Sequence, residues 1–275
     1  QWFTEIAMPN SRPPAVAGSF YPADARILAH DVRAMLHAAQ APSVTAKALI
    51  VPHAGYMYSG PVAAQAYAQL LRDADHIRRV VLLGPTHRVA VRGLALPEAD
   101  TFVTPLGRIE LDTATMRDLG TLPQVTLSAQ AHAFEHSLEV QLPFLQMALN
   151  GFRLVPLAVG DARDEEVAEV LERVWGGDET LIVVSSDLSH YLPYEVSQLV
   201  DRKTVQDILH LRRGITHDKA CGATPINGLL LAARRHHMTP HLLDLRNSGD
   251  TAGPRDGVVG YAAFAFTEES SDARH

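Results

Sequence analysis

The 275-residue chain lacks several features that define whole classes of protein. Its single cysteine, Cys221, rules out a disulfide within the chain and suits a reducing compartment. No apolar run approaches the roughly 20 residues that a membrane-spanning helix requires. Residues 1–7 lack the charged and apolar regions of a signal peptide. We therefore expect a cytoplasmic protein with no membrane segment.

Positive charge is also scarce. Lys and Arg number 24 against 31 Asp and Glu, which gives a formal net charge of −7 and a pI near 6.0. No cluster of Lys and Arg forms a basic stripe, so nucleic acid is not an expected partner. Hydrophobic residues, in contrast, make up 47% of the chain, which is enough for a large buried core.

Apolar runs alternate with amphipathic segments along the chain, which predicts strands that alternate with helices. The predicted strands are 46–51, 79–84, 91–97, 152–159, 180–185, 241–246 and 258–266. The predicted helices are 25–39, one from Pro61 onward, 113–120, 135–150 with a break at Pro143, 164–175, 194–211 and 225–235.

This alternation predicts an α/β fold with a mostly parallel or mixed central sheet and helices on both faces. The chain offers no convincing domain boundary, so we expect a single domain over residues 8–268. Flexible ends are expected at 1–7 and 269–275.

Three predicted strands end directly before a turn that carries an acid–base or metal-binding side chain. His53 follows strand 46–51, His87 follows 79–84, and Asp187 with His190 follows 180–185. Each alone is equally readable as a turn residue that bonds to backbone or faces solvent. Because ligands bind at the carboxyl ends of the strands in open α/β sheets, the three turns together predict one shared site.

Cys221 lies in a fourth turn, ahead of the helix predicted from Pro225. A lone cysteine is most often a small buried hydrophobe. Two functional interpretations stand beside that one: a third metal ligand next to two histidines, or a nucleophile paired with His190 in a Cys–His hydrolase. No G-x-S-x-G motif frames the nearby serines, and no G-x-G-x-x-G or P-loop motif is present, so a serine hydrolase and a nucleotide-binding protein are disfavoured.

A rival constellation is HAFEH at residues 132–136, which fits the H-x-x-E-H signature of one class of zinc peptidases. On a helix, His132 and His136 would share a face and could bind one metal, with Glu135 as base. The alternative is that Glu135 to Glu139 simply begins a helix with acidic residues in its first turn, near the strand-end site.

Nine stretches, in family order along nearly the whole chain, resemble the Memo family, which in many bacteria and archaea is named protein B of the AmmeMemoRadiSam system. They are PAVAGSFYP (14–22), PHAGYMYSGPVAAQAY (52–67), LLGPTH (82–87), TPLG (104–107), EHSLEVQLPFLQ (135–146), VPLAVGD (155–161), SSDLSHY (185–191), ACGATP (220–225) and VVGYAAFAF (258–266).

The resemblance implies a fold like that of the LigB-type class III extradiol dioxygenases, which hold Fe(II) with two histidines and a glutamate. The two Memo histidines match His53 and His87, and Cys221 stands where the dioxygenase glutamate would be. His190 matches the acid–base position, with Asp187 beside it. Relative to the dioxygenases, the cysteine in place of glutamate argues against ring cleavage.

We therefore expect a metal-binding redox protein that uses iron (Fe2+), with copper or zinc as alternatives. An enzyme of this kind would be a metal-dependent oxidoreductase related to dioxygenases. Tyr56, His136 and Tyr191 are expected to line the pocket and contact a small-molecule or peptide ligand. The resemblance also implies partner proteins of the AmmeMemoRadiSam system, including a radical SAM protein. The alternative function is a non-catalytic scaffold that binds a peptide or an anion in the same cleft.

Overall fold

A computed structural model describes residues 10–268, so the ends predicted to be flexible, 1–7 and 269–275, lie outside the described residues. The helices are α1 (Ala25–Ala38), α2 (Tyr56–Tyr67), α3 (Thr113–Leu119), α4 (Ala129–Ala133), α5 (His136–Glu139), α6 (Leu142–Ala148), α7 (Asp164–Val174), α8 (Tyr194–Leu209) and α9 (Ala223–Arg235). The strands are β1 (Ser11–Arg12), β2 (Ala48–Val51), β3 (Arg79–Pro85), β4 (Leu94–Leu96), β5 (Thr101–Thr104), β6 (Gly107–Glu110), β7 (Val125–Leu127), β8 (Arg153–Val159), β9 (Thr180–Ser185), β10 (His190–Leu192), β11 (Thr239–Asn247) and β12 (Val258–Thr267).

Within residues 10–268 the strands form one large sheet of nine strands and a small sheet of three. The large sheet has the order β10-β12-β2-β9-β3-β8-β4-β7, with β11 paired to β12, and the small one has the order β1-β5-β6. In the large sheet β2, β9, β3 and β8 are parallel, while β12 and β4 run antiparallel at their flanks. The predicted mixed sheet is confirmed.

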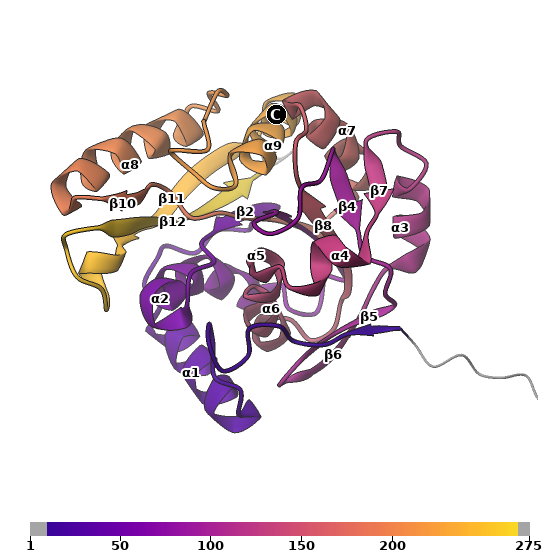
Figure 1. The fold of residues 1–275 in the computed structure, drawn as a ribbon, viewed down its shortest axis with the longest axis horizontal. Helices are drawn as coiled ribbons and strands as arrows, with labels where there is room; N and C mark the ends of the chain where they lie inside the picture. The colour runs from indigo at the N-terminus through magenta and orange to yellow at the C-terminus, as the bar shows by residue number, and fades with distance from the viewer. Residues whose placement is uncertain (1–9, 269–275) are drawn as a thin grey trace, which may run out of the picture.

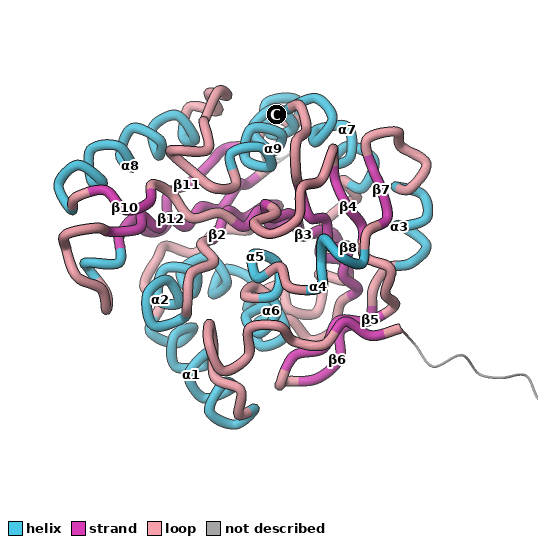
Figure 2. Tube along the Cα trace, in the orientation of Figure 1, coloured by secondary structure: helices cyan, strands magenta, loops and turns pink. Residues whose placement is uncertain are grey.

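The four parallel strands are buried on both faces because nearly all of their side chains are apolar. Helices α1, α2, α5 and α6 cover one face of the sheet, and α7, α8 and α9 cover the other (Figures 1 and 2). This two-sided cover leaves the carboxyl ends of the parallel strands together at one edge, where loops can carry polar groups. No helix within residues 10–268 has the length and apolar character needed to span a bilayer.

Several predicted elements are placed differently in the structure. α2 begins at Tyr56, so Pro61 lies inside the helix and not at its start. A proline there leaves one carbonyl without its helical N–H donor, a local cost that packing of a largely buried helix outweighs. The predicted helix 135–150 is broken into α5 and α6, with Pro143 in the first turn of α6, where a missing N–H costs nothing.

A buried ion pair fastens the N-terminal segment to α5. The Arg12 guanidinium lies 2.6 Å from the Glu139 carboxylate, and both side chains are buried. Arg12 also donates to the carbonyl oxygens of His132 and Glu135 at 2.7 and 2.8 Å, and the Tyr21 hydroxyl donates to Glu139 at 2.6 Å. Both charges in this network have hydrogen-bond partners, so the network can be buried, and it joins the N-terminal segment to α5.

Candidate metal centre

Three of the predicted site residues lie at the same edge of the sheet. His53, His87 and Asp187 each stand two residues beyond the end of β2, β3 and β9, respectively. These strands are parallel, and β9 lies between β2 and β3 in the sheet. The turns that follow them therefore project side by side.

His53, His87 and His136 form a cluster in which one ring nitrogen from each lies within 4.8 Å of the other two. The His53 ring stands edge-on to the other two, with centroids 5.2 Å from His87 and 5.3 Å from His136. His87 and His136 are stacked at 4.6 Å. The sequence suggested His136 as a residue that contacts a ligand, or as a zinc ligand paired with His132, but the structure makes it the third member of the cluster with His53 and His87.

His136 reaches the cluster because α5 packs directly on β3. At Gly84, a Cβ atom would lie 2.7 Å from the Ser137 hydroxyl and 3.0 Å from Leu138. The same Ser137 hydroxyl donates to the Pro85 carbonyl at 2.8 Å. Glycine at this strand position is therefore what permits the close approach of the helix.

Hydrogen bonds decide which nitrogen of His53 is free. The Ser185 hydroxyl donates its one hydrogen to the Ser137 carbonyl at 2.6 Å, and it accepts from the Gln141 amide at 2.9 Å. The Gln141 oxygen is taken by the Tyr67 hydroxyl, which confirms that the NH2 side of the amide faces Ser185. Ser185 must therefore accept from His53 Nδ1, 2.8 Å away. The lone pair of His53 is thus on Nε2, at the cluster.

Glu135 plays the same part for His87. Its Oε1 accepts from His87 Nδ1 at 2.8 Å, and its Oε2 accepts from the His87 backbone N–H at 2.6 Å. Burial disfavours the charged carboxylate, but hydrogen bonds from His87 and from the Ser137 N–H outweigh it and lower the pKa of Glu135 to about 2. An ionised carboxylate only accepts, so Nδ1 of His87 donates and Nε2 is left for a ligand.

Two histidines of the cluster, His53 and His136, are uncharged at neutral pH. Burial lowers the pKa of His53 well below its ordinary value, and the nearby His136 and His87 lower it further. Burial also lowers the pKa of His136 to about 4, and His87 adds to this effect. Neutral imidazoles are the form that binds a metal ion, so these nitrogens fit such a ligand.

Cys221 borders the cluster at His53. Its Sγ lies 3.3 Å from His53 Nε2, 3.8 Å from the Asp187 carbonyl and 3.9 Å from the Ser186 hydroxyl. A Cβ at Gly222 would lie 2.6 Å from Ser186 Cβ, so glycine lets this turn approach the end of β9. Burial raises the pKa of the thiol to about 12, with the Asp187 charge adding to the effect. A nucleophilic thiolate paired with His190 has no support in this environment.

Asp187 holds the His53 turn. Its Oδ1 accepts the His53 backbone N–H at 2.7 Å, and its Oδ2 lies 4.0 Å from His53 Nε2. Burial raises the pKa of Asp187 to about 7. Across residues 10–268, no hydrogen bond joins Asp187 to His190, which is half-buried on β10 and whose pKa is lowered by burial.

The two tyrosines expected to line the site lie outside the cluster. Tyr56 is buried, and its hydroxyl donates to the Val140 carbonyl at 2.7 Å. Tyr191 is 79% exposed, and its ring lies 5.9 Å from that of His190. Tyr56 also lines a cavity next to the cluster.

The peptidase interpretation of residues 132–136 is wrong. α4 ends at Ala133 and α5 begins at His136, so the two histidines of the motif do not share one helical face. His132 is buried away from the cluster, with its Nε2 2.8 Å from the Ala95 carbonyl. Glu135 orients His87. No local sequence pattern indicates this role, because Glu135 and His87 are distant along the chain.

Comparison with known proteins decides the family. The Memo-like protein family matches residues 12–265 of the chain. MEMO1 family proteins from Metallosphaera sedula, Aquifex aeolicus and Methanococcoides burtonii are 32, 34 and 37% identical to it. These alignments cover 94, 93 and 92% of this chain and 99, 98 and 98% of the relatives. The chain belongs to the Memo family.

The resemblance carried by the nine sequence stretches is thus confirmed, as is the expected Memo/LigB-like α/β fold. Among solved structures, the Memo chain is similar to the uncharacterized protein JW3007 from Escherichia coli K12, with a TM-score of 0.54. The match covers 79% of this chain and 98% of that one at 15% sequence identity, so it speaks for the fold alone.

Proposed function

We propose that this Memo protein binds a redox-active transition metal through His53 and His87, with Cys221 and His136 as the neighbouring donors. Iron is the redox-active metal we expect. Copper, which is also redox-active, and zinc, which is not, are the alternatives that the same donor set accepts. The cytoplasm remains the expected compartment, because a thiol donor needs reducing conditions.

The observation that supports this proposal most directly is the hydrogen-bond pattern behind the two histidines. Nδ1 of His53 donates to Ser185 and Nδ1 of His87 donates to Glu135, so Nε2 is the nitrogen with the lone pair in both rings. Metal-binding histidines characteristically donate their second ring N–H to a carboxylate, hydroxyl or carbonyl partner. In the part of the chain that the structure describes, the one hydrogen-bonding contact at the His53 Nε2 lone pair is the Cys221 sulfur at 3.3 Å, and a thiol is only a weak donor, so this lone pair stays available to a stronger ligand.

The sulfur position fits the same assignment. Two donors on one first-row metal, each at about 2.0–2.3 Å from it, lie roughly 3–4 Å apart. The 3.3 Å between Cys221 Sγ and His53 Nε2 falls in that range. When bound, the metal would supply electron transfer or Lewis-acid chemistry. The chain itself buries His53 away from solvent and fixes the tautomer of both histidines. His190, which is half-buried, would transfer a proton to or from a bound ligand.

Metal content tests the proposal. The full chain is purified anaerobically with reductant and without chelator, and bound iron, copper and zinc are measured by mass spectrometry. We expect about one metal ion per chain in the wild type and loss of most of it in His53→Ala and Cys221→Ser. The matched control is His37→Gln, which changes an exposed histidine of α1 and is expected to retain the metal.

Two outcomes would contradict the proposal. Metal-free protein in every preparation, even after incubation with Fe(II), would leave the scaffold alternative, in which the cleft binds a peptide or an anion. Equal metal content in His53→Ala, Cys221→Ser and His37→Gln would place any bound metal elsewhere. Uptake of zinc alone would contradict the proposed redox role but would support the proposed metal-binding site.

A further inference from the structure

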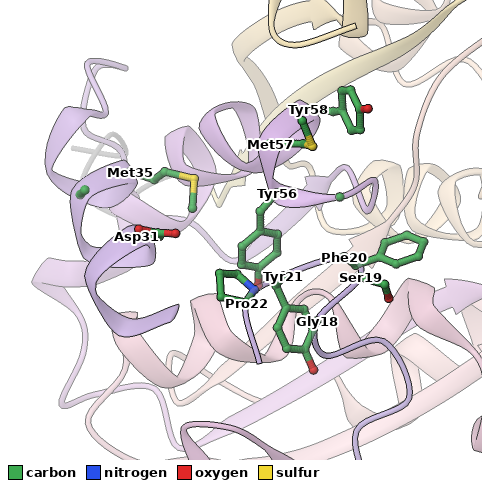
Figure 3. A pocket seen from close by; sticks show the side chains of 12 residues that line it. Gly18, Ser19, Phe20, Tyr21, Pro22, Asp31, Met35, Tyr56, Met57 and Tyr58 are labelled. Carbon is green, nitrogen blue, oxygen red and sulfur yellow. The ribbon is translucent and has the colours of Figure 1, made fainter. Parts of the chain in front are cut away.

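A cavity of about 540 Å³ lies between α1, α2 and the loop 18–22. Figure 3 shows its wall: Asp31 and Met35 from α1 on one side, and Tyr56 with Pro22 on the other. Cavities of roughly 300–1,000 Å³ are typical of sites for small organic molecules. This one differs from the metal centre in position and in chemistry, because no histidine or cysteine lines it.

Most of the cavity wall is apolar or aromatic. The hydroxyls of Tyr21 and Tyr56 are both used inside the protein, where they donate to Glu139 and to the Val140 carbonyl at 2.6 and 2.7 Å. These two residues therefore offer mainly ring carbons to the cavity. The thioethers of Met35 and Met57 add polarisable surface that adapts to the shape of a ligand.

One charged group stands in this wall. Asp31 is the one ionisable acid or base among the lining residues other than tyrosines. Within residues 10–268 its carboxylate has no ion pair and no side-chain hydrogen bond. In Figure 3 the carboxylate lies beside Met35, across from the Tyr56 ring. An unpaired negative charge next to aromatic rings is complementary to an organic cation.

We propose that this cavity binds a small organic ammonium ion, with the hydrocarbon body on the rings and thioethers and the charged nitrogen on Asp31. The inference does not depend on the metal centre, because none of the proposed metal donors lines the cavity. The two sites are neighbours all the same. The ring of Phe20, which lines the cavity, lies 4.7 Å from the ring of His136.

Isothermal titration of the metal-free full chain tests the inference with three probes of similar size. They are phenethylammonium, which is a cation, phenethyl alcohol, which is neutral, and hydrocinnamate, which is an anion. We expect the cation to bind more tightly than the alcohol and the anion not to bind. Asp31→Asn is expected to weaken binding of the cation about five- to tenfold and to leave the alcohol unaffected, because only the cation uses the carboxylate.

Three variants serve as controls. Glu98→Gln removes an exposed carboxylate outside the cavity and is expected to change nothing. Ala34→Phe fills the cavity from an exposed position of α1, so it is expected to abolish binding of every probe while the chain stays folded. His53→Ala removes a proposed metal donor and is expected to bind the cation as the wild type does.

The inference is overturned if no probe binds, if the alcohol or the anion binds as tightly as the cation, or if Asp31→Asn leaves the affinity for the cation unchanged. Binding that survives Ala34→Phe would also overturn it, because the ligand would then lie elsewhere. Since all titrations use metal-free protein, these outcomes are independent of whether the proposed metal function holds.

Discussion

Ser185 and Glu135 accept hydrogen bonds from Nδ1 of His53 and His87, and neither is itself in the cluster. The orientation of the two imidazole rings therefore depends on residues outside the cluster. The role of Ser185 is fully determined by its hydrogen bonds. Its hydroxyl donates to the Ser137 carbonyl and accepts from the Gln141 amide and from His53 Nδ1. Without that hydroxyl, nothing in the described contacts keeps the proton of His53 on Nδ1.

At this scale we predict that Ser185→Ala lowers metal affinity about 10- to 100-fold, the range typical for loss of a hydrogen bond behind a metal-binding histidine. Metal titration with a competing chelator measures it. The control is Ser59→Ala, which removes another buried hydroxyl, bonded to the Ala54 carbonyl at 2.9 Å, and should leave metal affinity unchanged. Equal affinities in the two variants would mean that the Ser185 hydroxyl does not hold the His53 tautomer.

At the scale of elements, the four-residue helix α5 carries the third histidine and cannot be stable by itself, because helices this short are not stable in isolation. Contact with β3 at Gly84 and the ion pair between Arg12 and Glu139 hold it in place. The position of His136 is therefore set by packing and by buried charge, and each of these can be tested separately.

We predict that Gly84→Ala destabilises the protein by about 1–3 kcal/mol, because the new methyl group would overlap the Ser137 hydroxyl and push α5 from the sheet. Urea unfolding measures the change in free energy. Gly120→Ala is the matched control, since a Cβ there meets no atom closer than 3.4 Å. Similar free energies of unfolding for Gly84→Ala and Gly120→Ala would show that α5 has room to move.

We also predict that Arg12→Met costs about 3–5 kcal/mol, because it leaves the Glu139 carboxylate buried without its counter-charge. Combining it with Glu139→Gln removes that uncompensated charge, so the double variant should be more stable than Arg12→Met alone. A double-mutant cycle of unfolding free energies measures the coupling. Strict additivity of the two changes would contradict a shared buried network.

At the scale of the whole molecule, buried histidines make stability depend on pH. His132 is buried beside the Ala95 carbonyl, and burial lowers its pKa from 6.5 to about 4. Between these values the unfolded chain binds a proton that the folded chain excludes. The contribution of the buried, neutral His132 to stability is therefore complete above pH 6.5 and is lost as the pH falls toward about 4.

We predict that His132→Gln flattens the acid side of the stability profile. The pKa shift of His132 corresponds to about 3 kcal/mol of stability lost by the wild type between neutral pH and about pH 4. Glutamine can still donate to the Ala95 carbonyl but does not titrate. Urea unfolding of both proteins at several pH values measures the difference. Parallel profiles would show that His132 is not the group responsible.

The sequence by itself determined the class of fold, the family and the places where chemistry could lie. Strand 180–185 is apolar at its four central positions and buried throughout, which suits only the middle of a covered sheet. Parallel strands end at one edge, so the turns of His53, His87 and Asp187 could be predicted to meet. These inferences need only local patterns and one topological rule.

Only the tertiary structure decided which of those groups act together. The break predicted at Pro143 in the helix 135–150 lies instead between Glu139 and Leu142. The paired histidines of the HAFEH motif do not form one site, because Phe134 and Glu135 separate α4 from α5. The carboxylate that holds His87, the serine that holds His53 and the pocket that exposes Asp31 all come from residues far apart in the chain. Partners of that kind are selected by packing and by the need to satisfy buried polar groups, which no local pattern records.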